Sequence, residues 1–374
     1  MTVSSTRVLV VGSHAESGFS MINFTRDNFA ALNRIEAKFE FIFTKPLTVF
    51  SKIIPGFPGS KYLTYLDKFL IFGPYLFILA FIKKVNIVHV LDQSDAIYRM
   101  FLMKKYKFVV TVHDLFAIQA ANNKIPEVVI GYPGRIYQRV ISAGLGKADL
   151  LLAISSTTER DIRNLFPKVA TMVAHNFLIH ENNLVPEYTY EKNVPNFFLI
   201  IMNSHWRKDR ISSIKVWKKL SSFYEFKNSN LVIVGNALTE DEVSLITTTS
   251  ISRVSIFENL ERREIVELYR GCIGVINISK YEGFGLPLIE ANIFGRICIY
   301  GGSNAFCEIA GLANIDWEQI EPNLIPQNIF EMLVSVERRR TAYLYAVKNF
   351  STQKYTHILI NAYLSLMEVE SDSQ

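Results

Sequence analysis

The stretch IGVINISKYEGFGLPLIEA, residues 273–291, joins a strand to a helix through a short turn that contains two glycines. Its first seven residues are mostly apolar and β-branched, which is typical of a strand buried on both faces. Gly283 and Gly285 permit unusual backbone dihedral angles and a close approach of the backbone to a ligand. Pro287 suits the first helical position, and the N–H groups at a helix N-terminus can bind an anion such as a diphosphate. The stretch therefore predicts a strand–turn–helix unit with an anion site at the turn.

Apolar runs of the same kind recur on both sides of this unit. In the first half of the chain they occupy residues 7–12, 39–44, 87–92, 108–114, 149–155 and 171–176. In the second half they occupy residues 196–202, 230–235, 253–259, 273–279 and 296–302. Helix-compatible stretches such as 20–35 and 133–146 lie between them, and this alternation implies right-handed crossovers and parallel sheets. We therefore predict an α/β fold with two Rossmann-like, doubly wound parallel-sheet domains.

The division into two domains follows from the chain length. At 374 residues the chain exceeds the roughly 250–300 residues at which a single hydrophobic core stops growing. The stretch 180–195 is polar, contains two prolines and lacks a sustained apolar period, so we expect the boundary there. Ligands of open α/β sheets bind beyond the carboxyl ends of the strands. We therefore expect the domains to face each other across a cleft that holds the ligand.

Composition indicates a globular chain in a reducing compartment. Hydrophobic residues make up 49% of the chain and aromatic residues 13%, which is unlike a disordered protein. The three cysteines form no C-x-x-C pair. The N-terminal MTVSSTRVLVVG lacks the apolar stretch and cleavage site of a signal peptide. We therefore expect the protein in the cytoplasm.

Motifs of several other enzyme classes are absent. No G-x-G-x-x-G follows the first strand, which disfavours a nicotinamide or flavin dinucleotide fold. The sequence also contains no G-x-x-x-x-G-K-[ST] loop, no H-E-x-x-H helix and no D-x-D pair that would hold a divalent metal against a diphosphate. We therefore expect neither a metal nor an organic cofactor.

Residues 45–84 combine basic and apolar character. They contain six lysines and one aspartate, and their apolar run 69–82 is interrupted only by Gly73 and Pro74. The run is shorter than the roughly 20 residues that span a bilayer, but a basic apolar segment is typical of contact with an anionic membrane surface. In that case we expect the protein at the inner face of the cytoplasmic membrane. The run can equally be a buried helix of the first domain with solvated lysines at its ends.

Two carboxylates, Glu282 and Glu290, frame the turn of the stretch 273–291. Carboxylates accept hydrogen bonds from hydroxyl groups, so we expect one to contact a transferred sugar and the other a ribose, while N–H groups and cations hold the phosphates. Each feature also has a structural interpretation. Glu290 can be a first-turn glutamate favoured by the helix dipole, and the glycines can form a plain tight turn. The combination favours the ligand site.

Two adjacent cations, Arg207 and Lys208, follow the first predicted strand of the second domain. At the carboxyl end of a strand they can neutralise a diphosphate leaving group and stabilise the charge that grows as a glycosidic bond breaks. Adjacent basic residues more often form a solvated face, but the position after a strand favours phosphate binding. In the first domain, His113 ends the run 108–114. There it can bind a sugar hydroxyl or serve as a structural hydrogen-bond partner.

The segment 279–291 closely resembles the E-x7-E signature of family 4 of the glycosyltransferases, which are retaining enzymes of GT-B fold. Blocks in that family's order cover nearly the whole chain, at 89–98, 109–118, 147–162, 173–176, 231–235, 264–279 and 306–311. Residues 349–366 resemble the family's terminal helix, which crosses back to the first domain. The sequence departs from the family at Met202-Asn203-Ser204, where relatives carry glycine, and in the loop 12–21, which lacks their paired glycines.

The resemblance implies domain functions and site residues. Residues 1–190 would form an acceptor-side domain, residues 191–348 a nucleotide-sugar-binding domain, and residues 349–374 a helix that packs back on the first domain. The catalytic residues would be His113, Glu282, Arg207 and Lys208. The donor would be bound by Arg207, Lys208, Glu282, Gly283, Phe284, Gly285, Leu286 and Glu290. Gly18 and Ser20 would lie in a loop near the acceptor and the phosphates.

The resemblance also implies a reaction. A hexose would pass, with retention of its anomeric configuration, from a nucleotide diphosphate sugar to a glycan or lipid-linked glycan in cell-surface polysaccharide or lipopolysaccharide synthesis. GDP-mannose is the donor that the general resemblance suggests. No metal would be needed, because Arg207 and Lys208 would take the role of a divalent ion. The leaving diphosphate would help to deprotonate the acceptor, so that catalysis depends on positioning and electrostatic stabilisation.

Other functions stay open. A non-catalytic relative that binds a nucleotide or glycan as an accessory protein would fit the missing glycine near Met202, whereas the presence of both Glu282 and Glu290 argues against it. A nucleotide-sugar epimerase of the same fold carries other signatures. Nucleic-acid binding is disfavoured because the formal net charge is only +5 and the excess is concentrated in one apolar stretch.

Overall fold

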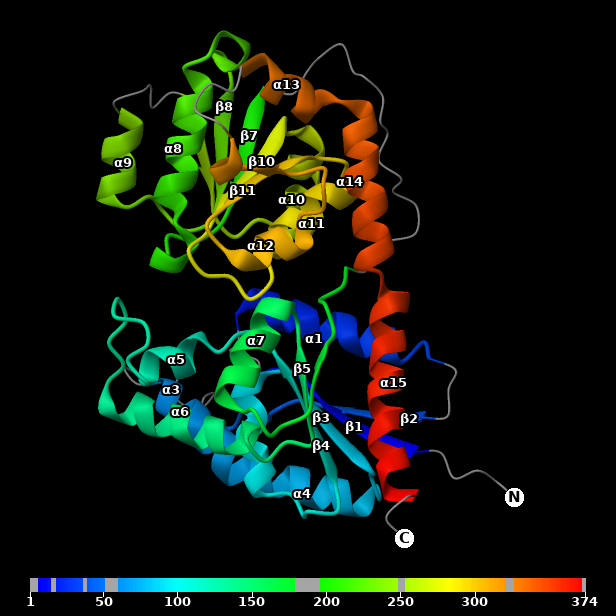
Figure 1. The fold of residues 1–374 in the computed structure, drawn as a ribbon. Coiled ribbons are helices and arrows are strands. Elements are labelled where there is room, and N and C mark those ends of the chain that lie inside the picture. Colours follow the sequence, from blue (N-terminus) through cyan, green and yellow to red (C-terminus); the bar gives the residue numbers. More distant parts are fainter. Residues whose placement is uncertain are drawn as a thin grey trace. The chain divides into compact units, whose positions relative to one another are not determined.

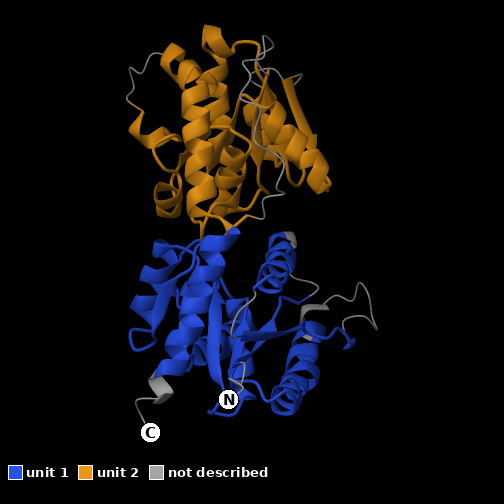
Figure 2. Ribbon diagram, turned by 90° about the vertical axis from the view of Figure 1, so that its right-hand side faces the viewer, with its two compact units in different colours: residues 1–175, 352–374 blue, residues 176–351 orange. Residues whose placement is uncertain are grey.

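The structure is a computed structural model that describes residues 6–14, 18–35, 39–50, 60–178, 196–247, 253–320 and 326–371. The chain folds into two compact units (Figure 2). Unit 1 contains Met1–His175 and Thr352–Gln374, and unit 2 contains Asn176–Ser351. The predicted boundary in 180–195 lies outside the described residues.

Unit 1 is built on a six-stranded sheet with the order β2-β1-β3-β4-β5-β6, in which all neighbouring strands are parallel (Figure 1). Its strands are β1 (Thr6–Val11), β2 (Phe39–Thr44), β3 (Ile87–Val90), β4 (Lys107–Val112), β5 (Leu150–Ala153) and β6 (Thr171–Val173). Its helical segments are α1 (Phe19–Leu32), α3 (Ser60–Leu66), η1 (Asp67–Phe72), α4 (Gly73–Ile82), η2 (Gln93–Met100), α5 (Phe116–Ala121), α6 (Tyr132–Leu145), α7 (Ser156–Leu165) and α15 (Thr352–Ser371).

Unit 2 repeats this architecture with a six-stranded parallel sheet in the order β12-β11-β10-β7-β8-β9. Its strands are β7 (Phe197–Ile201), β8 (Asn230–Val234), β9 (Val254–Phe257), β10 (Gly274–Ile278), β11 (Cys298–Gly301) and β12 (Ile315–Asp316). Its helical segments are η3 (Trp206–Lys208), α8 (Arg210–Ser221), η4 (Tyr224–Phe226), α9 (Glu240–Thr247), α10 (Arg262–Gly271), α11 (Leu286–Ile293), α12 (Asn304–Ile309), η6 (Trp317–Gln319), α13 (Pro326–Val334) and α14 (Val336–Asn349).

The predicted α/β fold with two doubly wound parallel sheets is confirmed. Every residue of β3, β5, β10 and β11 is buried, as the continuous apolar runs predict for strands covered by helices on both faces. The edge strand β9 is mostly exposed. The sequence did not predict β12, because two residues are too few to produce a recognisable pattern.

Helix α15 follows unit 2 in sequence but belongs to unit 1, where it packs beside α1 (Figure 1). Two buried tyrosines hold it. The hydroxyl of Tyr355 donates to Asn28 Oδ1 at 2.7 Å, and the hydroxyl of Tyr363 lies 2.7 Å from His89 Nδ1. The other ring nitrogen of His89 lies 2.8 Å from the Thr111 hydroxyl. These bonds satisfy polar groups that would otherwise be costly to bury.

Burial lowers the pKa of His89 to about 3, which makes its imidazole a source of pH-dependent stability. The unfolded chain binds a proton near pH 6.5 and the folded chain does not, so this stability is present above pH 6.5 and is lost as the pH falls toward 3. From pH 7 to pH 5 we expect the free energy of unfolding to fall about 2 kcal/mol more in the wild type than in His89→Gln. Urea unfolding followed by circular dichroism measures this difference. Equal pH dependence of the two proteins would contradict it.

The apolar run 69–82 is part of a longer helix than the sequence predicted. α3, η1 and α4 follow one another directly, and Gly73-Pro74 does not end the helix, since Pro74 lies in the first turn of α4. By length and composition, residues Leu63–Ile82 could cross a membrane, although 33% of this segment is buried. Core helices of soluble proteins can be equally long and apolar. The run 69–82 was predicted to be too short to span a bilayer, but the helix that contains it is long enough. Its buried face packs in unit 1.

The lysines of the basic apolar region divide into separate environments. Lys68 is buried and its ammonium lies 2.8 Å from Asp95 Oδ1, and the Lys45 ammonium lies 5.6 Å from the centroid of the Phe29 ring. Lys83 and Lys84 are exposed at the end of α4. The side chains of Lys52 and Lys61 are not among those that the structure describes.

Candidate functional site

The strand order of unit 2 reverses between β7 and β10. From β7 the chain proceeds to β8 and β9 on one side, and it returns to β10 on the other side before β11 and β12. The loops after β7 and β10 therefore leave the sheet side by side at its carboxyl edge, where open α/β sheets bind ligands. The N–H groups of Lys280 and Tyr281 donate to the carbonyl of Arg207 at 2.8 and 3.2 Å, which ties the two loops together.

A cation and a carboxylate meet at this point. The ammonium of Lys208 lies 2.6 Å from Glu282 Oε1, and the hydroxyl of Ser279 donates to the same oxygen at 3.0 Å. The side chain of Glu282 is only 8% exposed and that of Lys208 27%. The structure thus brings two of the predicted catalytic residues into contact, and Lys208 compensates the charge of a nearly buried carboxylate. The sequence placed them in separate loops and did not predict this ion pair.

Two helix N-termini begin directly beside this pair. α8 starts after Asp209, whose φ of 37° is left-handed and whose carboxylate accepts the N–H of Ser212 at 3.2 Å. α11 starts after Gly285, whose φ of 105° favours glycine and where a Cβ would overlap the ring of Phe306. Pro287 is the second residue of α11 and not the first. The left-handed backbone of Asp209 is the kind of local strain that occurs at functional turns. Both helix starts offer N–H groups to an anion.

His205 lies in the loop after β7, close to Arg207 and Lys208 in the sequence. Its pKa is lowered by partial burial and by the neighbouring charges of Arg207 and Lys208. The sequence analysis did not single out His205, because one histidine before a basic pair has no distinctive spacing. Of these causes, only the charges of Arg207 and Lys208 indicate a positive environment after β7.

Glu290 lies in the second turn of α11, so its interpretation as a first-turn glutamate is wrong. Its Oε2 accepts the hydroxyl of Tyr269 at 2.8 Å, and its Oε1 lies 2.5 Å from Arg262 Nη1. Both partners come from α10, and no sequence pattern indicates that either one contacts Glu290. Burial and the Glu290 charge raise the pKa of Tyr269 well above its usual value, so the phenol stays a donor. A carboxylate has about four acceptor sites, which leaves room for a ligand hydroxyl.

The remaining predicted donor-binding residues belong to the turn and the start of α11. The ring of Phe284 is buried against Phe350 at a centroid distance of 5.6 Å, so this residue can offer a ligand only its backbone. Gly283 lies in the turn, and Leu286 is the first residue of α11.

The missing glycine at Met202 does not prevent close packing of the backbone. A Cβ at Gly235, on the neighbouring strand end, would overlap the carbonyl oxygen of Met202. Packing of the ends of β7 and β8 therefore requires glycine at position 235. Asn236, the next residue, donates its backbone N–H to Asn203 Oδ1 at 3.1 Å and accepts the N–H of Ser204 at 2.7 Å.

Arg210 and Glu242 form a buried ion pair behind these loops. Arg210 Nη2 lies 2.6 Å and Nε 2.8 Å from the two Glu242 oxygens, and the side chains are 0% and 2% exposed. The guanidinium also donates to the carbonyls of Asn236 at 2.8 Å and Ala237 at 2.9 Å. The pair fixes the end of β8 against the start of α8.

His113, Gly18 and Ser20 lie in unit 1. The ring nitrogen Nε2 of His113 donates to the Leu91 carbonyl at 2.9 Å, and its backbone N–H donates to Gln93 Oε1 at 2.9 Å. Because a carbonyl only accepts, Nε2 carries a proton and Nδ1 is left to accept a hydroxyl when the ring is neutral. Gly18 has an ordinary φ of −57° and open space around it, so the backbone there does not require glycine. Ser20 is exposed on α1.

A metal site is not apparent in the described part of the chain. Within residues 6–14, 18–35, 39–50, 60–178, 196–247, 253–320 and 326–371, no group of three or more His, Cys, Asp or Glu side chains is placed to hold an ion.

Comparison with protein families matches unit 2. Residues 189–317 match the family described as "Glycosyl transferases group 1", and this range contains Arg207, Lys208, Glu282 and Glu290. No curated protein sequence matches the chain. The match supports a glycosyl transfer function.

Solved structures similar to this chain share its fold at low sequence identity. The lipopolysaccharide outer core galactosyltransferase WaaB in its apo form has a TM-score of 0.61 and 15% identity, covering 96% of this chain and 99% of WaaB. The structure described as "Trehalose-6-phosphate from E. coli bound with UDP-2-fluoro glucose" has a TM-score of 0.63 and 9% identity, covering 95% and 98%. TarM has a TM-score of 0.54 and 14% identity over 74% of this chain, which spans only 54% of TarM. These likenesses support the two-domain Rossmann-like fold of GT-B glycosyltransferases.

Proposed function

We propose that this chain is a glycosyltransferase that binds its nucleotide diphosphate sugar at the point between β7 and β10 where the strand order of unit 2 reverses. The observation that carries the proposal is the contact of Lys208 with the nearly buried Glu282 beside two helix N-termini. These elements lie within the range that matches the glycosyl transferase family. Together they offer an anion site and a hydroxyl acceptor side by side.

In this proposal different groups of the site bind the diphosphate and the sugar of the donor. Lys208, Arg207 and the N–H groups at the starts of α8 and α11 hold the diphosphate and stabilise its growing negative charge. Glu282 accepts hydroxyls of the transferred sugar once the ammonium of Lys208 moves to the phosphate. The transfer retains the anomeric configuration, and the leaving diphosphate takes the proton of the acceptor. His113 contributes a hydrogen bond to the sugar through Nδ1.

Glu290 recognises the ribose. Tyr269 and Arg262 hold its carboxylate in one orientation, and its remaining acceptor sites receive the ribose hydroxyls. The general resemblance favours GDP-mannose as the donor and a lipid-linked or surface glycan as the acceptor. UDP-2-fluoro glucose in a structurally similar protein favours testing UDP with equal weight.

Calorimetric titration with UDP, GDP, ADP and their sugar conjugates tests the donor site. We expect one nucleotide to bind, and we expect Glu290→Gln to weaken its binding about 10- to 100-fold, because hydrogen bonds to a charged group contribute about 1.5–3 kcal/mol. Glu267→Gln is the matched control, since Glu267 is exposed and pairs with Arg270 of the same helix. Failure of every nucleotide to bind would remove the proposal. Binding without donor turnover in the presence of acceptors would instead favour a non-catalytic accessory protein.

A further inference from the structure

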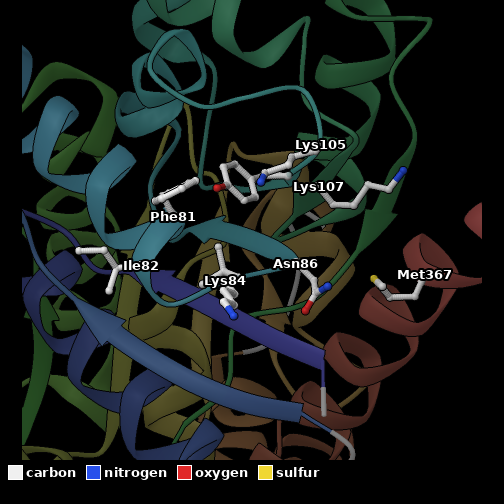
Figure 3. Close-up of a pocket in the computed structure, with 9 residues that line it drawn as sticks. Phe81, Ile82, Lys84, Asn86, Lys105, Lys107 and Met367 are labelled. Atoms are coloured by element: carbon white, nitrogen blue, oxygen red, sulfur yellow. The ribbon is translucent and has the colours of Figure 1, made fainter. Parts of the chain in front are cut away.

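A pocket of about 550 Å³ lies at the amino ends of β3 and β4 in unit 1 (Figure 3). Its walls come from the end of α4, the start of β3, residues 105–107 and Met367 of α15. Lys107 is the first residue of β4, whereas His113 follows the last residue of that strand. The pocket therefore opens at the opposite edge of the sheet from His113 and is separate from the proposed donor site in unit 2.

Three lysines line the pocket, namely Lys84, Lys105 and Lys107 (Figure 3). The ammonium of Lys105 is held 5.7 Å from the Phe81 ring centroid and 5.1 Å from that of Tyr106. The described ion pairs include neither Lys84 nor Lys105, and the segments 73–91 and 96–113 contain no aspartate or glutamate. Although Glu368 follows Met367, the pocket wall is dominated by positive charge. It is suited to an anionic group.

An exposed apolar surface adjoins the lysines. Phe81 and Ile82 line the pocket and are 58% and 66% exposed, and Leu70 and Ile78 on the same helical segment are 60% and 53% exposed. The opposite face, formed by Phe72, Leu76 and Ala80, is fully buried in unit 1. The helix is thus anchored in the protein on one side and presents large apolar side chains on the other.

We propose that this pocket binds the phosphate headgroup of an anionic phospholipid while the exposed face of α4 lies in the surface of the bilayer. Continuity of the two features favours a lipid, because Phe81 and Ile82 belong both to the lysine-lined pocket and to the apolar face. A soluble phosphate would use only the pocket. The buried face of α4 keeps the helix attached to unit 1, so the helix lies on the membrane and does not cross it.

This proposal goes beyond glycosyl transfer and does not depend on it. It also changes the membrane-contact region that the sequence predicted. Lys45 and Lys68 are directed elsewhere in unit 1, whereas the lysines at 104–107, which follow η2, join Lys83 and Lys84. The contact surface is therefore built from two separate stretches of the chain.

Vesicle co-sedimentation of the full chain tests the proposal. We expect binding to vesicles of equal parts phosphatidylcholine and phosphatidylglycerol, weak binding to pure phosphatidylcholine, and loss of binding at high salt. Lys84→Gln and Lys105→Gln should each weaken binding about fivefold. Lys124→Gln, which removes an exposed charge after α5, should leave it unchanged. The double substitution Phe81→Ser/Ile82→Ser should abolish binding without unfolding the chain, as circular dichroism would verify, because both side chains are mostly exposed.

Three outcomes would overturn the proposal. Equal weakening by all three lysine variants would mean that net charge and not the pocket attracts the vesicles. Binding of glycerol 3-phosphate at Lys84 without any vesicle binding would identify a soluble phosphate as the ligand. Dimerisation in solution that Phe81→Ser/Ile82→Ser abolishes, together with no vesicle binding, would mean that a second copy of the chain covers α4.

Discussion

Replacing Lys208 by alanine is expected to lower kcat/KM for glycosyl transfer by about 10²- to 10³-fold. Its ammonium is held 2.6 Å from Glu282 between the starts of α8 and α11, where the charge of a leaving diphosphate would grow. The loss of one preorganised group that stabilises transition-state charge typically lowers the rate by this factor. The effect should fall mainly on kcat, because the charge increases in the transition state.

The rate of nucleoside diphosphate release from the donor chosen by titration measures this loss. Lys215→Ala is the matched control, because Lys215 is exposed on α8 and its substitution removes the same charge from unit 2. Lys208→Arg should keep more activity than Lys208→Ala, since it retains the positive charge. Thermal unfolding of each variant separates a catalytic loss from instability, since Glu282 loses its cation. An unchanged kcat/KM in Lys208→Ala would exclude the assigned role.

Replacing Arg210 by methionine is expected to destabilise unit 2 by about 3–5 kcal/mol, because the substitution leaves Glu242 buried without its cation. Burial raises the pKa of Glu242, but the hydrogen bonds from Arg210 and the Thr239 N–H outweigh burial and leave that pKa lowered. The carboxylate is thus ionised and depends on the guanidinium. The carbonyls of Asn236 and Ala237 lose donors as well.

Urea unfolding followed by tryptophan fluorescence isolates this effect, because all three tryptophans of the chain, at positions 206, 217 and 317, lie in unit 2. Arg263→Met is the control at an exposed position of α10. The double variant Arg210→Met/Glu242→Met should lose less stability than the two single variants combined, since removing both charges leaves neither one unpaired. Additive losses would show that the two side chains stabilise unit 2 independently.

The sequence predicted those features that depend on local pattern. Runs of buried β-branched residues identified the strands, and Gly285 with Pro287 located the turn before α11 to within one residue. Lys208 and Glu282 were both predicted as site residues, but their ion pair was not. Contact between two loops depends on strand order, which the local pattern does not show. Tyr269 and Arg262 were missed for the same reason, since they reach Glu290 from another helix.

The continuous helix through Gly73 and Pro74, and the pocket beside α4, could not be predicted from sequence patterns for a different reason. Gly73 and Pro74 normally indicate a helix end, but the π-helical segment before them accommodates Pro74 within the first turn of α4. The pocket combines residues near 81–86, residues 105–107 and Met367. No periodicity connects positions so far apart.

The placement of α15 has a consequence for the biogenesis of the protein. Strands β1–β6 of unit 1 are synthesised before unit 2, yet the two tyrosines of α15 that contact Asn28 and His89 are synthesised only after all of unit 2. Domains generally fold as units during synthesis, so unit 2 can complete its fold while unit 1 still lacks helix α15. Until α15 emerges, the nascent chain carries an unfinished apolar surface that chaperones would have to cover.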